Sequence, residues 1–289
     1  MRYLVYLFIY PILWCISILP FRFLYVLSDF IFIIIYYIVG YRKKLVRNNI
    51  KITLPHLSDK ERLEVEKKSF RHMCDMFLEM IKTMTISESD MNKRYVFSNL
   101  KLFKEVEQEK KSIALMIAHY ASYEWVISMN SKMKYKGYAI YKRLNNPYFD
   151  KLVRKIRTKF KANLITTKAT IPTIEENHKN NVLSVYGFAS DQSPRLSATF
   201  HWKKFMGIEV PVHTGAEMLA KKYDLNVLFL KTRKIKRGFY EGTFETLSLD
   251  AKNVPNYQIT DKFLELVEQQ IYEAPELYLW SHNRWKHKK

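Results

Sequence analysis

A histidine and a glutamate stand where a long apolar run ends. The run from Ile113 to Ala118 has the length of a buried β-strand and stops at His119, while Glu124 lies among apolar and aromatic residues typical of a helix start. This pattern predicts a strand, a turn that holds His119, and a helix whose first turn holds Glu124. A neutral imidazole can take a proton from a hydroxyl while a neighbouring carboxylate orients it. We interpret His119 and Glu124 as a catalytic pair; the alternative is a histidine satisfied by backbone groups beside a solvated glutamate.

Two further predicted strands end close to charged residues. The segment Tyr138–Tyr141 leads to Arg143, and Val182–Tyr186 leads to Asp191 and Gln192. In an open α/β sheet, the carboxyl ends of the strands deliver the residues of the site. The fork of Arg143 can bind a phosphate or a carboxylate, including that of Asp191. We therefore expect Arg143, Asp191 and Gln192 to bind substrate or to support the catalytic pair.

The rest of the chain alternates between predicted strands and helices. Ser58–Glu61 has the form of a capping box and predicts a helix that continues to about residue 85. Asn146, followed by proline, starts a helix after the second strand and joins the supporting residues of the site. Residues 226–232 and 239–247 are predicted to pair as strands, and a last helix is expected to be capped at Thr260. This alternation indicates a doubly wound α/β fold.

The H-x4-E motif resembles the H-x4-[DE] signature of membrane glycerolipid and lipid A acyltransferases, and its surroundings resemble the bacterial lipid A biosynthesis acyltransferase family. In that family the late enzymes add lauroyl or myristoyl chains to lipopolysaccharide precursors. The resemblance covers about Tyr41 to Trp285 and depends on six blocks in family order: Tyr41-Arg42-Lys43-Lys44 with Asn48-Asn49 and Leu54-Pro55; His119 to Glu124; Lys142-Arg143-Leu144-Asn145-Asn146-Pro147; Asp191-Gln192; Gly207-Ile208 with Thr214-Gly215; and Pro275-Glu276 with Leu279-Trp280 and Arg284-Trp285-Lys286.

The resemblance implies an α/β fold in which a glycerolipid-acyltransferase-like mixed sheet is flanked by helices, with an N-terminal apolar membrane helix or hairpin. It also implies that acyl carrier protein donates the acyl chain and that a lipid A precursor accepts it on a hydroxyl of a 3-hydroxyacyl chain. His119 would be the base and Glu124 its orienting partner, on the cytoplasmic face of the inner membrane. The spacer Tyr120–Tyr123 differs from the glycine- and asparagine-containing spacer of many members, which bears on the identity of the substrate.

A formal net charge of +20 on 289 residues requires an anionic partner. The candidates are nucleic acid, an anionic lipid surface or an acidic protein. The sequence contains no nucleic-acid-binding motif, and its apolar N-terminus favours anionic membrane lipids, so we expect no nucleic-acid partner.

The two cysteines, Cys15 and Cys74, show neither metal-ligand nor disulfide spacing. We expect no metal site and no cofactor.

The first 41 residues are almost free of charge. Residues 3–21 carry none and residues 23–41 carry only Asp29, so each run approaches the roughly 20 apolar residues that span a bilayer. A spanning or deeply embedded helix and a short helical hairpin both fit these runs. The alternative is a cleaved signal peptide, but the sequence has neither the strongly basic start nor the small-residue cleavage site of one. Basic residues from Arg42 onward predict that the remainder is cytoplasmic. We therefore divide the chain into a membrane anchor, residues 1–41, and an acyltransferase domain, residues 42–289.

Two other functions remain open from the sequence. A related acyltransferase acting on another glycolipid, an aminolipid or a mannolipid would use the same catalytic blocks. A noncatalytic basic membrane-binding protein would explain the charge and the apolar start, but it would not explain charged groups at three strand ends.

Overall fold

A mixed seven-stranded sheet lies at the centre of the computed structural model, which describes residues 2–289. The strand order is β1-β9-β8-β2-β5-β3-β4; β9 runs antiparallel to β8, and the other neighbours are parallel. This arrangement confirms the predicted α/β fold with a mixed sheet. The strands are β1 (Tyr95–Phe97), β2 (Ile113–Ile117), β3 (Lys136–Tyr141), β4 (Asn163–Thr166), β5 (Ser184–Ala189), β8 (Asn226–Lys236) and β9 (Phe239–Ser248), with a separate hairpin of β6 (Trp202–Phe205) and β7 (Ile208–Pro211).

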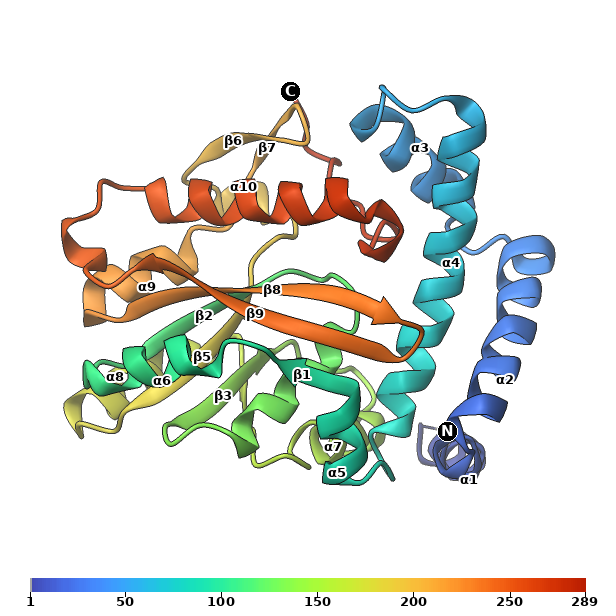
Figure 1. The fold of residues 1–289 in the computed structure, drawn as a ribbon, viewed down its shortest axis with the longest axis horizontal. Coiled ribbons are helices and arrows are strands. Elements are labelled where there is room, and N and C mark those ends of the chain that lie inside the picture. The colour runs from blue at the N-terminus through green and yellow to red at the C-terminus, as the bar shows by residue number, and fades with distance from the viewer. Residues whose placement is uncertain (1) are drawn as a thin grey trace.

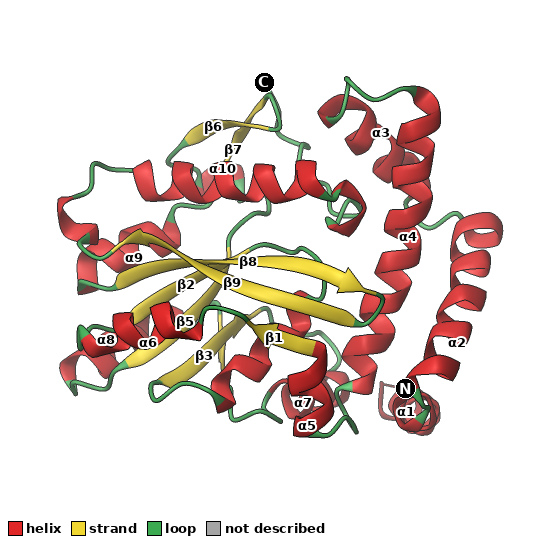
Figure 2. Cartoon of the chain, viewed as in Figure 1, coloured by secondary structure: helices red, strands yellow, loops and turns green. Residues whose placement is uncertain are grey.

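Helices cover both faces of the sheet, α9 and α10 on one side and α5, α6 and α7 on the other (Figure 1). Colouring by secondary structure shows the two helical layers around the strands (Figure 2). The helices are α1 (Arg2–Ile18), α2 (Phe21–Ile33), the π-helix η1 (Ile34–Val39), α3 (Lys43–Thr53), α4 (Asp59–Lys82), α5 (Glu88–Arg94), α6 (Leu100–Gln108), α7 (Pro147–Arg157), α8 (Thr170–Lys179), α9 (Gly215–Tyr223), α10 (Gln258–Glu273) and the 3₁₀ segments η2 (Tyr123–Ser131), η3 (Leu196–Ala198), η4 (Ala251–Asn253) and η5 (Pro275–Leu277).

The central strands are continuous apolar runs because helices cover both of their faces. In β2, every residue from Ile113 to Met116 is buried, and its neighbour β8 is equally buried from Val227 to Leu230. Strands that are buried on both sides carry such uninterrupted runs instead of an alternation of apolar and polar residues. The strand that ends at His119 is therefore held rigidly in the core of the domain.

Helix α4 is the longest helix and begins where the capping box predicts. The hydroxyl of Ser58 accepts from the amide of Glu61, and the carboxylate of Glu61 accepts from the amide of Ser58 at 2.7 Å. These two bonds satisfy amides that have no partner inside the helix. Figure 1 shows α4 crossing the end of the sheet at which β8 terminates, with α2 on its outer side. One face of α4 thus meets the sheet and the other meets the N-terminal helices.

The N-terminal helices are held against α4 and remain apolar on their outer side. The helical segment Phe21–Val39 is long and apolar enough to cross a membrane, with a mean hydropathy of 1.9 over its most apolar window. Phe23, Phe30 and Ile38 on its outer side are 64%, 59% and 75% exposed. The other side packs on α4, where the hydroxyl of Tyr36 donates to Glu66 at 2.9 Å.

Two local predictions have different outcomes. The segment after the turn is a helix whose first turn holds Glu124, as predicted, and it is of the 3₁₀ type. The predicted cap at Thr260 is wrong: α10 begins two residues earlier, at Gln258, and the hydroxyl of Thr260 donates to Glu217 at 2.7 Å. A buried carboxylate on a different helix thus binds the threonine that the sequence suggested as a local cap.

Candidate active site

The register of β2 and β5 brings His119 and Asp191 together. Ile117 of β2 lies opposite Ala189 of β5 in a parallel pair, and each site residue follows two positions later. Parallel neighbours are about 4.8 Å apart, so residues at matching positions beyond the two strand ends are within side-chain reach. In the sheet order, β5 lies between β2 and β3. Asp191, which follows β5, is therefore one strand away from the end of β2, whereas residues that follow β3 are two strands away.

Asp191 holds His119 by two hydrogen bonds to one carboxylate oxygen. Its Oδ1 lies 2.7 Å from the Nδ1 of His119 and accepts from the His119 amide at 3.1 Å. A carboxylate on Nδ1 favours the tautomer with the proton on that nitrogen and leaves Nε2 to accept a proton. Asp191 is fully buried, whereas the His119 side chain keeps 19% of its surface exposed. The histidine is therefore anchored from inside the protein and open on the other side.

The charges of this pair shift both pKa values. Burial alone would lower the pKa of His119, but the charge and hydrogen bond of Asp191 outweigh it, so the pKa lies above its ordinary value. Burial would raise the pKa of Asp191, and the contacts with His119 outweigh this effect and lower it. Asp191 thus stays ionised and increases the proton affinity of the imidazole, as a base of this kind requires.

The expected pairings of Glu124 and Arg143 are wrong in the structure. Glu124 binds the guanidinium of Arg157 at the end of α7, with contacts of 2.8 and 2.5 Å. Arg143 is 71% exposed and lies 3.9 Å from Asp150. Asp191, which we expected to pair with Arg143, binds His119 instead. The cause is geometric: Glu124 and Arg157 form a two-pronged ion pair, and Arg143 extends into solvent from the end of β3.

The turn that carries His119 is fastened to the C-terminal segment. The amide of Ala121 donates to the carbonyl of Leu277 at 2.9 Å, and the amide of Leu279 donates to the carbonyl of His119 at 3.2 Å. Ala121 has a φ of 50°, in the left-handed region that residues with a Cβ rarely adopt. Such a backbone persists only when its surroundings hold it, and it occurs often at functional sites.

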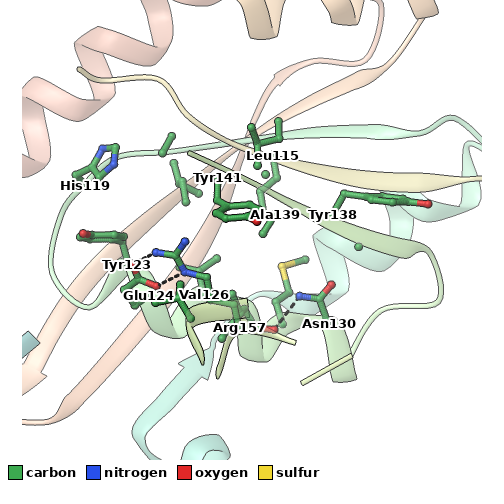
Figure 3. A pocket seen from close by; sticks show the side chains of 18 of the residues that line it. Leu115, His119, Tyr123, Glu124, Val126, Asn130, Tyr138, Ala139, Tyr141 and Arg157 are labelled. Atoms are coloured by element: carbon green, nitrogen blue, oxygen red, sulfur yellow. Dashed lines mark hydrogen bonds and ion pairs between the residues drawn. The ribbon is translucent and has the colours of Figure 1, made fainter. Parts of the chain in front are cut away.

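An apolar cavity of about 480 Å³ extends from the histidine into the domain. Figure 3 shows His119, Tyr123, Glu124 and Arg157 gathered near one end, while Asn130 and Tyr138 lie toward the other. Most of the wall is aliphatic, aromatic or methionine, from β2, β3, β5, η2, α4 and α7. A long apolar space with a few polar groups at one end fits a fatty chain whose reactive group lies beside His119.

Gly137 lines this cavity. A Cβ built at this position would lie 1.6 Å from the Oδ1 of Asn130 and 2.2 Å from the Cε of Met133. Any side chain at residue 137 would therefore force Asn130 and Met133 to move. Asn130 lies toward the end opposite His119 (Figure 3), and Met133 and Gly137 line the cavity beside it.

The remaining predicted site residues lie outside this cavity. Asn146 caps α7, where its side chain accepts from the amide of Tyr148 at 3.0 Å, so its observed role is structural. Gln192 is half-buried directly after Asp191. Two residues that we did not predict belong to the site: Arg157, which binds Glu124, and Tyr123, whose ring centre is 5.0 Å from that of His119. Tyr123 lies inside the H-x4-E motif, but no local signal distinguishes Arg157 from the other basic residues of α7.

Comparisons with known proteins agree with this geometry. Residues 1–287 match the family model described as bacterial lipid A biosynthesis acyltransferase. The chain is 23% identical over 279 residues to the lipid A biosynthesis lauroyltransferase of Escherichia coli (strain K12), which covers 95% of this chain and 89% of that protein. It is 22% identical over 260 residues to the lipid A biosynthesis palmitoleoyltransferase of the same organism, covering 85% and 79%. A lipid A biosynthesis acyltransferase of Shigella flexneri matches to the same extent.

The family match spans almost the whole chain, and it includes the anchored histidine, its carboxylate and the elements that line the apolar cavity. The chain belongs to the bacterial lipid A biosynthesis acyltransferase family and is an acyltransferase.

Proposed function

We propose that this protein transfers a fatty acyl chain from an acyl carrier protein thioester to a hydroxyl of a 3-hydroxyacyl chain on a lipid A precursor. In this reaction the Nε2 of His119 removes the hydroxyl proton while the oxygen attacks the thioester carbonyl. The new C–O bond forms, the C–S bond breaks, and the proton passes from His119 to the departing thiolate. The observation that carries the proposal is the His119–Asp191 pair at the polar end of an apolar cavity.

The carboxylates support this chemistry in different ways. Asp191 stabilises the imidazolium that forms when His119 takes the proton, because it bonds directly to Nδ1. Glu124 acts as a second negative charge near His119 and raises its pKa, although its own bonds go to Arg157. We therefore keep Glu124 in the catalytic centre as an electrostatic partner of the base and assign the orienting role to Asp191.

Exposed basic residues on α7 support a protein-bound donor. Lys151, Arg154 and Lys155 are exposed on this helix, whose last residue, Arg157, lines the cavity. Acyl carrier proteins are acidic, and a basic surface next to the cavity would attract such a donor. Arg143, exposed ahead of the same helix, and Gln192, beside Asp191, are proposed to contact the substrates.

The outer side of residues 1–41 supports contact with a membrane. Apolar residues of α1 and α2 are exposed there, for example Phe8 at 72% and Phe23 at 64%. Asp29 on α2 is ion-paired with Arg237 at 2.8 Å, so the helix is fastened to the domain by its polar side. We propose that α1 and α2 lie on the cytoplasmic face of the inner membrane, where the basic chain meets anionic lipids.

The test is acyl transfer by the purified protein, with either an acyl carrier protein thioester or a small acyl thioester as donor and a lipid A precursor as acceptor. Mass spectrometry of the lipid gives the mass added and its position. We expect one fatty acyl group on a 3-hydroxyacyl chain, and His119→Ala to lower the rate by about 10²–10⁴-fold. A stoichiometric acyl adduct on the intact protein during turnover, or near-normal transfer by His119→Ala, would contradict the proposed mechanism.

A further inference from the structure

Glu79 is a fully buried carboxylate on α4 that the proposed acyl transfer does not use. Three hydroxyls donate to its carboxylate oxygens: Tyr25 at 2.9 Å, Ser122 at 2.9 Å and Tyr240 at 3.0 Å. Burial raises the pKa of Glu79, and the negative charge of Asp75 acts in the same direction. Since hydroxyl bonds are directional, these donors fix where Glu79 lies relative to each of them.

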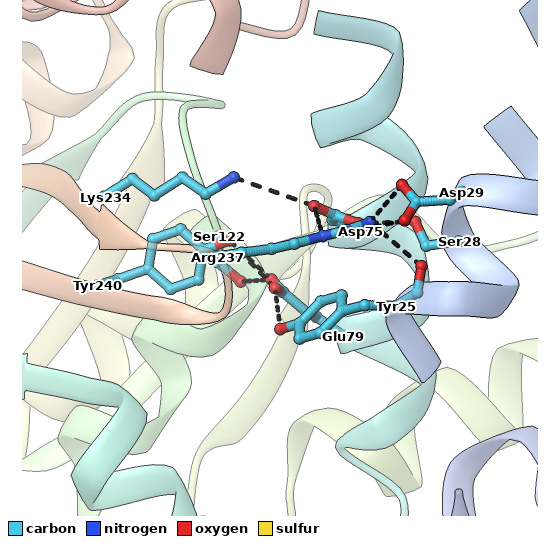
Figure 4. A network of polar contacts seen from close by, with 9 residues as sticks. All are labelled: Tyr25, Ser28, Asp29, Asp75, Glu79, Ser122, Lys234, Arg237 and Tyr240. Atoms are coloured by element: carbon cyan, nitrogen blue, oxygen red, sulfur yellow. Dashed lines mark hydrogen bonds and ion pairs between the residues drawn. The ribbon is translucent and has the colours of Figure 1, made fainter. Parts of the chain in front are cut away.

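The three donors come from parts of the chain that are far apart in sequence. Tyr25 belongs to α2, Ser122 to the turn after β2, and Tyr240 to β9. Figure 4 shows their side chains converging on Glu79, next to the ion pairs of Asp75. Glu79 is therefore the point at which the N-terminal helices, the sheet and the turn that carries His119 are joined.

The backbone of Glu79 holds the same stretch of chain at a second position. Its carbonyl accepts from the indole Nε1 of Trp125 at 3.1 Å. Trp125 is fully buried and directly follows Glu124 of the site. Phe21 of α2 packs edge-on against this indole, with ring centres 6.3 Å apart. Helix α2 thus reaches the catalytic segment through Glu79 and through a direct aromatic contact.

The turn is clamped from two sides around its strained residue. On one side Ser122 binds Glu79, and on the other the amide of Ala121 binds Leu277. Ala121, between His119 and Ser122, has the left-handed φ that an alanine adopts only under such restraint. The strained backbone at Ala121 is therefore held by bonds to two separate parts of the domain.

Helix α2 is itself fixed by strong polar contacts. Arg237 at the tip of the β8–β9 hairpin binds Asp29 of α2 at 2.8 Å and Asp75 of α4 at 2.7 Å. The buried hydroxyl of Ser28 also donates to Asp75 at 2.7 Å. Lys82 caps the end of α1 by donating to the carbonyl of Ser17 at 2.7 Å. The position of Tyr25 beside Glu79 is therefore set by several independent bonds.

We propose that Glu79 is a positioning residue for acyl transfer, through which helix α2 holds the turn that carries His119. The inference rests on the proposed role of His119 as the base and extends it to the N-terminal segment. Helix α2 then has two functions: its outer side faces lipid, and its inner side keeps the imidazole in place. The same residues that suggest an anchor are part of the support of the catalytic site.

The chain contains a matched control for this idea. Tyr36, in the same helical segment as Tyr25, donates to Glu66 of α4 at 2.9 Å, which is the same kind of bond, but Glu66 has its other contacts with Arg47. We would compare Tyr25→Phe and Ser122→Ala with Tyr36→Phe in the full-length protein. Three quantities are measured: kcat and KM with a small acyl thioester, the thermal unfolding midpoint, and the pKa of His119 by NMR titration of its ring.

We expect Tyr25→Phe and Ser122→Ala to lower kcat by about 10- to 100-fold, because small displacements of a catalytic group cost that much, with little change in KM. The pKa of His119 should fall, since its bond to Asp191 loosens. Tyr36→Phe should lower the unfolding midpoint about as much as Tyr25→Phe does, with kcat and the His119 titration unchanged. Glu79→Gln, which keeps the shape of the side chain, should retain more activity than Glu79→Ala.

If Tyr25→Phe and Tyr36→Phe have equal effects on kcat and leave the His119 titration unchanged, Glu79 has only a structural role and the inference is wrong. The NMR titration needs no turnover, so it tests the positioning even if the wild-type protein fails to transfer acyl groups, a result that would contradict only the proposed function. None of the variants alters Asp191, Glu124 or Arg157, whose charges act on the histidine, nor Tyr123, whose ring lies against it, nor His213 and His282, which are coupled to it electrostatically.

Discussion

Two carboxylates lie near His119, and they differ in what they bind. Asp191 bonds to the imidazole and is fully buried, whereas Glu124 bonds to Arg157. The sequence motif contains Glu124 but not Asp191, which lies 72 positions after the histidine. The motif therefore predicted a histidine and a nearby negative charge, whereas the carboxylate that bonds to the imidazole could be identified only from the three-dimensional arrangement.

Asp191→Asn should move the acidic limb of the pH–rate profile to lower pH. Asp191 holds the pKa of His119 above its ordinary value, and only the neutral imidazole is a base, so the rate falls as the pH falls through that pKa. Without the charge, the pKa of His119 drops and the neutral form persists into more acidic solution. We also expect kcat to fall by about 10²-fold or more, because the imidazolium loses its partner.

A second histidine–carboxylate pair, which is partly buried, provides the control. His201 and Asp261 lie 2.8 Å apart, away from the cavity residues. Asp261→Asn should leave both the pH profile and kcat as they are. An acidic limb that stays in place in Asp191→Asn would show that Asp191 does not set the pKa of the base.

Glu124→Gln should destabilise the protein because Arg157 then has no charged partner. The side chains of Glu124 and Arg157 are 9% and 22% exposed. Removing one member of a buried ion pair lowers the free energy of unfolding by about 3–5 kcal/mol. Because Arg157 is partly exposed, we expect a loss at the lower end, about 3 kcal/mol. The double variant Glu124→Gln/Arg157→Met should cost much less than the two single changes together. Urea unfolding gives these free energies.

Glu241→Gln, which breaks the ion pair with the 67%-exposed Arg233, is the control and should change the free energy of unfolding by about 0–1 kcal/mol. Equal losses at the two pairs would count against a buried role for Glu124.

At the scale of elements, local patterns predicted most of the secondary structure, and the strand order was not available from them. The capping box at Ser58, the start of α7 after Asn146 and the pairing of β8 with β9 were all confirmed. The insertion of β5 between β2 and β3 comes from long-range pairing. That insertion makes the end of β5 a neighbour of both β2 and β3, and Asp191 binds His119 because the two residues follow paired positions of β2 and β5, whereas the Arg143 side chain is 71% exposed.

The end of the cavity away from His119 should set the acyl chain length. Asn130 lies toward that end (Figure 3), and a Cβ at Gly137 would meet both Asn130 and Met133, so Met133 lines the cavity beside it. Met133→Ala removes the thioether from this end and lengthens the space, and each buried CH₂ contributes about 0.8 kcal/mol. We expect competition between acyl thioesters of different length to shift toward longer chains, with two more methylenes favoured by up to about 10-fold. Met218→Ala on α9, where the side chain is 44% exposed, should not alter the preference; the same preference in both variants would exclude Met133 as part of the cavity end.

At the scale of the molecule, the apolar outer side of the N-terminal helices and the net charge of +20 are the two features that support the proposed contact with an anionic membrane. The apolar runs were predicted from the sequence, but their inner contacts were not, because no local pattern shows that Tyr25 meets Glu79 or that Asp29 meets Arg237. These contacts cross the proposed boundary between residues 1–41 and 42–289. The two segments are thus joined by these partly buried bonds and by the buried bonds of Ser28 to Asp75 and Tyr36 to Glu66.

Replacing Phe8, Phe23 and Phe30 by serine should weaken binding to vesicles. All three side chains are at least 59% exposed, and full burial of a phenylalanine contributes about 1.5–3 kcal/mol, so partial insertion of three predicts a loss of about 10²-fold in partitioning. Flotation with neutral and anionic vesicles measures it, and binding to anionic vesicles should also weaken at high salt. Ile171→Ser, at a 52%-exposed position on α8, is the control. Flotation that is indifferent to the three substitutions would rule out a lipid-facing role for these helices.

The contact between Asp29 and Arg237 spans 208 positions of the chain. During synthesis α1 and α2 leave the ribosome first, when neither α4 nor the β8–β9 hairpin exists to receive their polar side chains. Their apolar surface must then be covered by lipid or by a chaperone while most of the protein is still to be made. Tyr25 can bind Glu79 once α4 has formed, but the arginine that fastens the helix arrives only with the β8–β9 hairpin. The polar side of α2 therefore remains without this partner until the central strands of the sheet have been made.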